Sequence, residues 1–243
     1  GRYLSDELAI HYGLIPRTNR GILCINELPD LAERLQVGLF NLLEERDIQI
    51  RGYPVRLSLD MLLVASANPE DYTSRGKIIT PLKDRFGSQV RTHYPASIED
   101  EIAIVEMESP LSSNDGLETY VPRYMREIIA EVTHLARSSP NINQSSGVSV
   151  RVSIANYKTM VSNAVRRAVS LGEKLAVPRI SDLPHIHSSI ASKIELESFE
   201  AKEDKLIDEL IDQAVLAVFK HYFKMETIES VAAAFQGASV DVS

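Results

Sequence analysis

The segment that decides the fold is Asn19–Glu27, which reads NRGILCINE. Its apolar run Ile22–Ile25 follows Gly21 and is typical of a short strand buried in a parallel sheet. Asn26 and Glu27 come directly after this run. Polar residues in that position lie at the carboxyl end of a strand, where open α/β sheets bind their ligands. The segment therefore predicts a sheet edge with a functional carboxylate, although many purely structural strands also end in acidic residues.

More strands and a helix are predicted downstream of this segment. Leucines at helical spacing from Leu31 to Leu43 predict a helix, with Asp30 as its N-cap. The runs Ile48–Ile50 and Val55–Leu57 flank a turn that contains Gly and Pro, and so predict a β-hairpin. Two further short runs, Met61–Ala65 and Gln89–Tyr94, predict the second and third core strands.

After Pro95 the pattern becomes helical. Apolar residues at helical spacing predict helices at 98–105, 124–135, 154–168 and 207–222, and Ser181-Asp182 is expected to open another. Ser, Asn, Pro and Gly fill residues 138–148, which predicts a loop. Strands alternate with helices in the first part and helices fill the second, so we expect an α/β layer followed by a helical bundle.

Composition narrows the class of protein. The 243 residues are 44% hydrophobic and carry a net charge of −8, which disfavours broad nucleic-acid binding. The sequence holds no apolar run of the roughly 18–20 residues that a membrane span needs. Cys24 is the single cysteine, which excludes a disulfide framework and suits a reducing, cytoplasmic compartment. We expect Cys24 to be a buried strand residue.

Three polar residues flank the predicted strands. Glu27 follows the first strand, Asn68 follows the second, and Arg85 precedes the third. Phosphoryl transfer needs one group that orients water, one that contacts the transferred phosphate and one that neutralises developing charge. The set is suited to that chemistry.

Several motifs, in this order, resemble the AAA+ core of MoxR proteins and magnesium-chelatase ATPase subunits. Residues 19–27 resemble the Walker B strand, 42–50 (LLEERDIQI) the helix and inserted hairpin, 65–69 (ASANP) sensor 1, 84–86 (DRF) the arginine finger, and 147–154 (GVSVRVSI) the sensor-2 start of a lid helix. The resemblance covers roughly residues 12–190. It implies a partial αβα core at 1–95, a helical lid at 96–198 and a helical extension at 199–243.

The resemblance also implies cofactors and roles. With ATP and Mg²⁺ as cofactors, Glu27 would orient the attacking water and Asn68 would sense the γ-phosphate. Arg85 would reach the ATP of a neighbouring subunit in a ring, expected to be a hexamer, and Arg151 would touch the nucleotide from the lid. No residue is expected to bind a metal ion directly. Mg²⁺ is expected to be bound together with ATP, near Asn26 and Glu27.

The same resemblance assigns the hairpin to a partner. Arg51, Tyr53 and Arg56 would face a protein client or move with the nucleotide state. A partner with a von Willebrand-type domain is compatible with this group, and no membrane is expected.

The sequence departs from the family pattern in two places. Asn26 stands where most AAA+ proteins carry Asp, and an uncharged amide offers less to hydrated Mg²⁺. The phosphate-binding loop G-x-x-x-x-G-K-[ST] is absent from the 243 residues, and the nearest fragment is 75–78 (RGKI). Because this loop follows a central strand, we expect that strand to be missing beside the sensor-1 strand, which would leave backbone groups unpaired. Gly1 in place of Met and the absent loop suggest a fragment.

Three functions remain open at this point. The first is an ATP-hydrolysing motor that remodels a partner protein or assists metal insertion, inactive as this chain alone. The second is a non-catalytic module that contributes an arginine finger and a lid to a ring. The third is a sigma-factor-interacting transcriptional regulator, although the Gly-Ala-Phe-Thr-Gly-Ala client loop of that group does not occur in the sequence.

Overall fold

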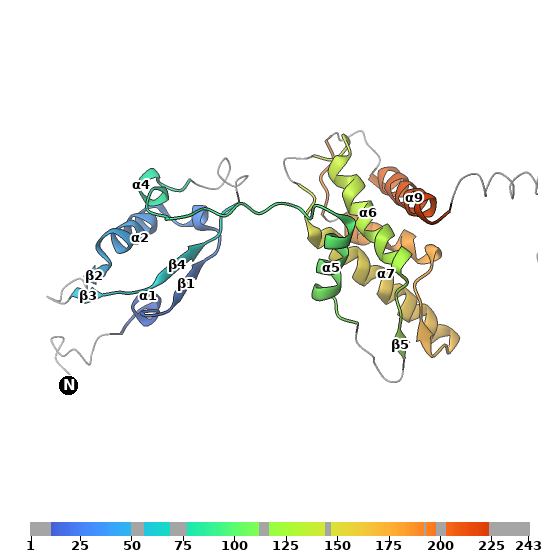
Figure 1. Cartoon of the computed structure of the whole chain (residues 1–243), viewed down its shortest axis with the longest axis horizontal. Coiled ribbons are helices and arrows are strands. Elements are labelled where there is room, and N and C mark those ends of the chain that lie inside the picture. Colours follow the sequence, from blue (N-terminus) through green and yellow to red (C-terminus); the bar gives the residue numbers. More distant parts are fainter. Residues whose placement is uncertain are drawn as a thin grey trace, which may run out of the picture. The chain divides into compact units, whose positions relative to one another are not determined.

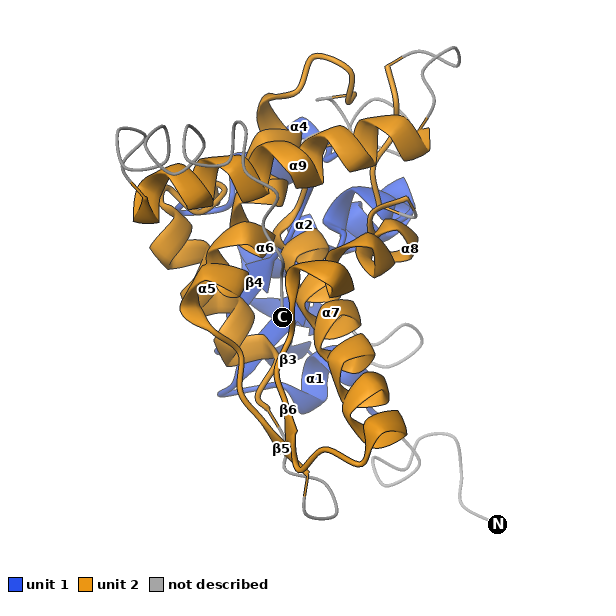
Figure 2. Cartoon of the chain, turned by 90° about the vertical axis from the view of Figure 1, so that its right-hand side faces the viewer, with its two compact units in different colours: residues 1–91 blue, residues 92–243 orange. Residues whose placement is uncertain are grey.

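The structure is a computed structural model. It describes residues 11–49, 56–68, 77–111, 117–143, 147–191, 193–197 and 203–223. The chain divides into two compact units, residues 1–91 and 92–243, coloured blue and orange in Figure 2. Each unit has a hydrophobic core of its own.

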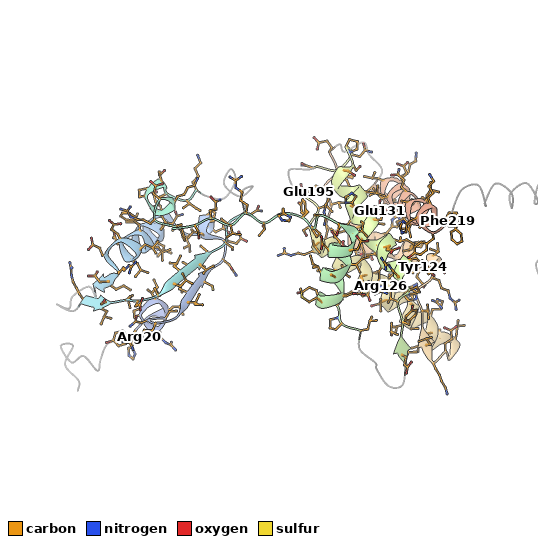
Figure 3. All side chains as sticks on the ribbon, in the orientation of Figure 1. Arg20, Tyr124, Arg126, Glu131, Glu195 and Phe219 are labelled. Carbon is orange, nitrogen blue, oxygen red and sulfur yellow. The ribbon has the colours of Figure 1, made fainter. Side chains whose placement is uncertain are left out.

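Two parallel strands form the centre of the first unit. β1 (Ile22–Ile25) pairs with β4 (Leu62–Ala65), with Ile22 opposite Leu62 and Ile25 opposite Ala65 (Figure 1). Arg20, labelled in Figure 3, precedes β1, and its backbone N–H donates to the Asp60 carbonyl at 2.6 Å. The structure thus confirms the first two predicted strands and their parallel pairing.

Helix α2 (Glu33–Glu45) packs against one face of this strand pair. The buried core of the unit comprises Leu28, Leu39, Leu42, Leu59 and Leu82. The short helices α1 (Leu14–Arg17), η2 (Leu28–Asp30) and α4 (Thr80–Lys83) complete the unit. The predicted N-cap is wrong, because Asp30 ends the 3-10 turn η2 and Ala32 stands at the N-cap of α2.

The opposite face of the strand pair is exposed. Alternate side chains point to it, and Ile22, Leu62 and Val64 are 61%, 59% and 48% exposed. Cys24 lies on the same face and is exposed, so the prediction of a buried cysteine is wrong. The reason is the pleat: Leu23 is buried and lies on the same face as Ile25, which packs against the core of the unit, while Cys24 turns to the exposed face.

The predicted hairpin is confirmed by the pairing of its strands. β2 (Asp47–Gln49) and β3 (Arg56–Ser58) are antiparallel, with Ile48 opposite Leu57. The turn between them, which includes Arg51 and Tyr53, lies outside the described residues.

The predicted third core strand at Gln89–Tyr94 is wrong. These six residues form no strand and are exposed, Val90 to 87%. Alternating apolar and polar residues favour a strand only where a neighbouring strand offers hydrogen bonds, and no described strand pairs with this segment.

The second unit is built of helices around α6. Its main elements are α5 (Ile98–Glu108), α6 (Arg123–Ser138), α7 (Val150–Leu171), η3 (Ile180–Ile186), α8 (His187–Ile190) and α9 (Glu203–Tyr222). α6 packs against α5, α7 and α9, and α9 buries its apolar side in the same core (Figures 1 and 2). Two short strands, β5 (Glu118–Thr119) and β6 (Leu175–Ala176), pair in parallel beside the helices.

Local capping explains where these helices begin and end. The Ser97 and Ser149 hydroxyls accept N–H groups in the first turns of α5 and α7. Gly172 ends α7 in the left-handed region at φ 68°. The helix expected from Ser181-Asp182 is a 3-10 helix, because Pro184 provides no backbone N–H for an α-helical ladder.

In coarse terms the fold agrees with the expectation of an α/β part followed by helices. None of the helices among the described residues combines the length and apolar character that a bilayer crossing needs.

Candidate functional site

The carboxyl ends of β1 and β4 meet at one edge of the first unit. Ser66, directly after β4, donates its backbone N–H to the Ile25 carbonyl at 2.9 Å. The Ser66 carbonyl in turn accepts the Leu28 N–H at 2.9 Å. These two bonds hold Asn26 and Glu27, the residues between them, beside Ser66. The structure therefore brings the predicted acidic position to the carboxyl edge of the strand pair, the edge at which open α/β sheets generally bind ligands.

Glu27 has an unusual backbone conformation. Its φ and ψ are 52° and 55°, in the left-handed region that non-glycine residues adopt at a cost of roughly 1–2 kcal/mol. Its N–H donates to the Ser66 hydroxyl at 3.2 Å, which supports this conformation. Glu27 is exposed. Such backbone outliers cluster at functional sites, where the surrounding structure holds them in place.

Ser66 is the residue of this edge that the sequence reasoning passed over. Besides accepting from Glu27, its hydroxyl donates to the Asn26 side-chain oxygen at 3.5 Å, a long contact. Asn68 follows two residues later and is exposed. The signal that could have identified Ser66 was a hydroxyl directly after a predicted strand, because a residue in that position lies beside the end of the neighbouring strand.

Arg85 follows α4, and its guanidinium contacts α2. It forms an ion pair with Glu44 and lies 5.4 Å from the centre of the Phe40 ring. The two charged side chains are 40% and 42% exposed. The proposed arginine finger is thus paired within its own chain, a contact that spacing alone did not indicate.

The remaining predicted residues fall in two places. Arg56 lies on β3 and forms an exposed ion pair with Asp47 at 3.4 Å. Arg151 lies in the second unit, in the first turn of α7, where its N–H donates to the Ser149 hydroxyl at 3.2 Å. Arg151 is exposed, which leaves its guanidinium accessible to a ligand.

The donors at the strand edge suit a hard cation. Asn26, Glu27 and Ser66 offer an amide oxygen, a carboxylate and a hydroxyl, the oxygen ligands that Mg²⁺ prefers. No cluster of three or more His, Cys, Asp or Glu side chains occurs in the described part of the chain.

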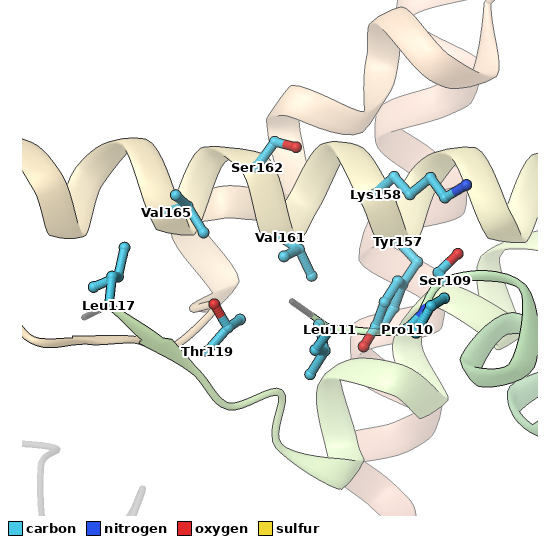
Figure 4. Close-up of a pocket in the computed structure, with 10 residues that line it drawn as sticks. All are labelled: Ser109, Pro110, Leu111, Leu117, Thr119, Tyr157, Lys158, Val161, Ser162 and Val165. Carbon is cyan, nitrogen blue, oxygen red and sulfur yellow. The ribbon is translucent and has the colours of Figure 1, made fainter. Parts of the chain in front are cut away.

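A separate cavity of about 410 Å³ lies in the second unit, between α7 and the segment that leads to β5 (Figure 4). Leu111, Val161 and Val165 make much of its lining apolar. Tyr157 also lines it, and burial raises the pKa of this phenol above its ordinary value. None of the predicted site residues that the structure describes lines this cavity.

Comparison with known proteins gives one family-model match, which lies within the first unit, and similarities to several known proteins. A family model described as the sigma-54 interaction domain matches residues 6–85. The magnesium-chelatase 38 kDa subunit of Cereibacter sphaeroides is 31% identical over 101 residues, 41% of this chain and 29% of that protein. Magnesium-chelatase subunit ChlI of Anabaena variabilis is 33% identical over 123 residues, 47% of this chain and 34% of that protein.

Other similarities are weaker. The archaeal Lon protease of Thermococcus kodakarensis is 25% identical over 137 residues, 51% of this chain and 21% of that protein. The match to a solved structure of an ATPase candidate from Cytophaga hutchinsonii covers 79% of this chain and 64% of the solved chain. The sequence identity is 13% and the TM-score is 0.32. A score this low supports no structural argument.

The family-model match and the magnesium-chelatase relatives confirm the resemblance to the AAA+ ATPases. Within that class, the chain is similar to subunits of magnesium chelatase. The matched stretch spans about a third of the length of those relatives.

Proposed function

We propose that this chain is part of an ATP-hydrolysing AAA+ motor of the MoxR and magnesium-chelatase kind. Glu27 orients the attacking water, Asn68 contacts the transferred phosphate and Arg151 contacts the nucleotide from the helical unit. The observation that carries the proposal is the left-handed Glu27, hydrogen-bonded to Ser66 at the carboxyl edge of parallel strands.

The motor requires a phosphate-binding loop that the 243 residues do not contain. We therefore assign the activity to a longer protein in which an upstream segment supplies it. The exposed apolar side chains Ile22, Leu62 and Val64 support a further layer in that protein, because parallel sheets are ordinarily covered on both faces.

ATP and Mg²⁺ are the cofactors of this proposal. Asn26, Glu27 and Ser66 would hold the hydrated ion. Bound Mg²⁺ would neutralise charge on the phosphate oxygens. Because Asn26 is uncharged, we expect weaker Mg²⁺ binding than a carboxylate in its place would give.

The motor works as a ring of copies of the parent protein, expected to be a hexamer. Arg85 acts on the ATP of a neighbouring copy. For this, its guanidinium leaves the ion pair with Glu44 and binds a phosphate instead. The work is the remodelling of a protein client or assistance to metal insertion, in the cytoplasm. Arg51, Tyr53 and Arg56 face the client or a partner with a von Willebrand-type domain.

The test measures ATP turnover in this chain and in a version extended upstream to include the phosphate-binding loop. We expect turnover only in the extended protein, and a loss of at least about 100-fold in kcat with Glu27→Gln, which cannot accept a proton from water. Glu45→Gln, at the end of α2, is the matched control and keeps normal turnover. An extended protein that neither binds nor hydrolyses ATP would contradict the proposal.

That negative outcome would favour the non-catalytic module, in which Arg85 and the helical unit serve a ring whose other members bind ATP. A sigma-factor-interacting regulator is the further candidate, favoured by the matched sigma-54 interaction domain. Its client loop Gly-Ala-Phe-Thr-Gly-Ala does not occur in the sequence. A pull-down with purified sigma-54 separates this candidate from the other two.

A further inference from the structure

Arg137, near the end of α6, is the centre of a buried polar cluster in the helical unit. Its Nη1 and Nη2 donate to the two carboxylate oxygens of Glu101 at 2.6 and 2.9 Å. The Arg137 and Glu101 side chains are only 11% and 2% exposed. A two-pronged pair of this kind fixes the orientation of both groups as well as their distance.

The cluster extends from α5 and α6 to α7. The Ser153 hydroxyl donates to Glu101 and lies 2.7 Å from the Thr133 hydroxyl. Ser153 and Thr133 are fully buried. Buried polar groups that are mutually hydrogen-bonded hold the elements that carry them in one arrangement. The first turns of α7 are thereby fastened to both neighbouring helices.

The same guanidinium reaches two backbone segments. Its Nε donates to the Val148 carbonyl at 2.8 Å, two residues before α7 begins. Its other side faces the Tyr94 ring, with the guanidinium carbon 4.6 Å from the ring centre. Tyr94 is the third residue of the helical unit, which starts at Thr92. Arg137 therefore joins the segment that enters the unit to the turn that opens α7.

Gly147 shows how closely these segments approach. Its φ is 68°, a conformation that favours glycine, and a Cβ added there would collide with the Tyr94 hydroxyl. Next along the chain, Val148 is fully buried and Ser149 caps α7. The turn Gly147–Ser149 is thus held from both sides by Tyr94 and Arg137.

Arg151 extends from the helical turn that this arrangement fixes. We infer that Arg137 is a positioning residue for Arg151, and that it ties Tyr94 to the opening turn of α7. The inference rests on the proposed function, in which Arg151 contacts the nucleotide. A displacement of the entering segment is transmitted through the Tyr94 ring and the Val148 carbonyl to the backbone three residues before Arg151.

The test compares ATP dissociation constants in the extended protein. Tyr94→Leu removes the ring beside the guanidinium and keeps the ion pair with Glu101, so the unit still folds. We expect it to weaken ATP binding by about 3- to 10-fold. Tyr124→Leu, an exposed tyrosine on α6, is the matched control and leaves the constant unchanged.

The double variant decides whether the effect passes through Arg151. In an Arg151→Ala background, Tyr94→Leu has no further effect if Arg137 works by positioning Arg151. An undiminished effect in that background overturns the inference. Arg137→Lys keeps the charge beside Glu101 but loses the Nε donor to Val148, and it behaves as Tyr94→Leu does.

A second readout needs no nucleotide and uses the 243-residue chain. Tyr94→Leu accelerates hydrogen exchange at the amides of Arg151 and Val152 by about 3- to 10-fold, because their turn loses one of its two supports. Unchanged exchange overturns the tie between Tyr94 and α7. If Arg151→Ala leaves ATP affinity unchanged while exchange still rises, the tie holds and the nucleotide-sensing role of Arg151 fails.

Discussion

Gln36 is a single uncharged side chain on which the first unit depends. It is 2% exposed, and its amide nitrogen donates to the Leu31 and Lys77 carbonyls at 2.9 and 3.1 Å. Its side-chain oxygen accepts the Ile79 N–H at 2.9 Å. Through these bonds α2 holds the segment that leads to α4 and Arg85.

We expect Gln36→Leu to destabilise the first unit by about 1–3 kcal/mol, because similar volume is kept while buried backbone groups lose their partners. Urea unfolding followed by circular dichroism measures the change. Gln89→Leu, at an exposed position, is the control. Equal unfolding midpoints for the two variants would contradict this role of Gln36.

At the scale of elements, Asp182 joins α7 to η3. Its carboxylate accepts from the Asn163 amide at 2.7 Å, from Arg167 Nη2 at 2.9 Å and from the Arg179 backbone N–H at 2.8 Å. Burial alone would raise the pKa of Asp182, but hydrogen bonds from Arg167 and the Arg179 backbone outweigh it and hold the pKa below its ordinary value.

A lowered pKa in the folded state makes the stability pH-dependent. The contribution of Asp182 is fully present above the pKa of an unfolded aspartate, about 3.9, and is lost as the pH falls through the lower folded value. We expect Asp182→Asn to lower the unfolding free energy of the helical unit at pH 7 by up to about 3–5 kcal/mol. Below about pH 4, the difference in unfolding free energy between the variant and the unchanged protein should shrink. Urea unfolding between pH 7.5 and 3.5 measures this, with Asp212→Asn as control. A difference independent of pH would contradict it.

Elements also show where sequence patterns suffice. The runs Ile22–Ile25 and Met61–Ala65 predicted strands correctly, because an apolar run between turn residues determines a local conformation. Gln89–Tyr94 was wrong because a strand also needs a partner, which a local pattern does not contain. The same limit applies to Cys24, whose exposure depends on whether another element covers its face.

The candidate site was predictable to a similar extent. The positions of Asn26 and Glu27 at a strand end follow from the pattern, and the structure places them there. The contact of Arg85 with Glu44 joins the segment after α4 to α2, and that of Arg137 with Glu101, 36 residues away, joins α6 to α5. No spacing rule within one element reveals such pairs, since they depend on how helices pack.

At the scale of the whole molecule, the two units have separate cores. The buried cluster of the first unit uses residues 28–82, and that of the second uses residues 105–218. We expect calorimetry of the 243-residue chain to resolve two unfolding transitions, because each core is lost cooperatively by itself. Gln36→Leu should lower only one transition temperature and Asp182→Asn only the other. A single transition that both variants shift would contradict this.

The left-handed backbone of Glu27 has a consequence for anyone who improves this protein by selection. Replacing a strained non-glycine residue with Gly or Asn relieves that strain, so a screen for thermal tolerance would favour Glu27→Gly or Glu27→Asn. Either change deletes the carboxylate that follows β1 directly. Selection for heat resistance alone would therefore enrich more thermostable variants that have lost the carboxylate proposed to activate water.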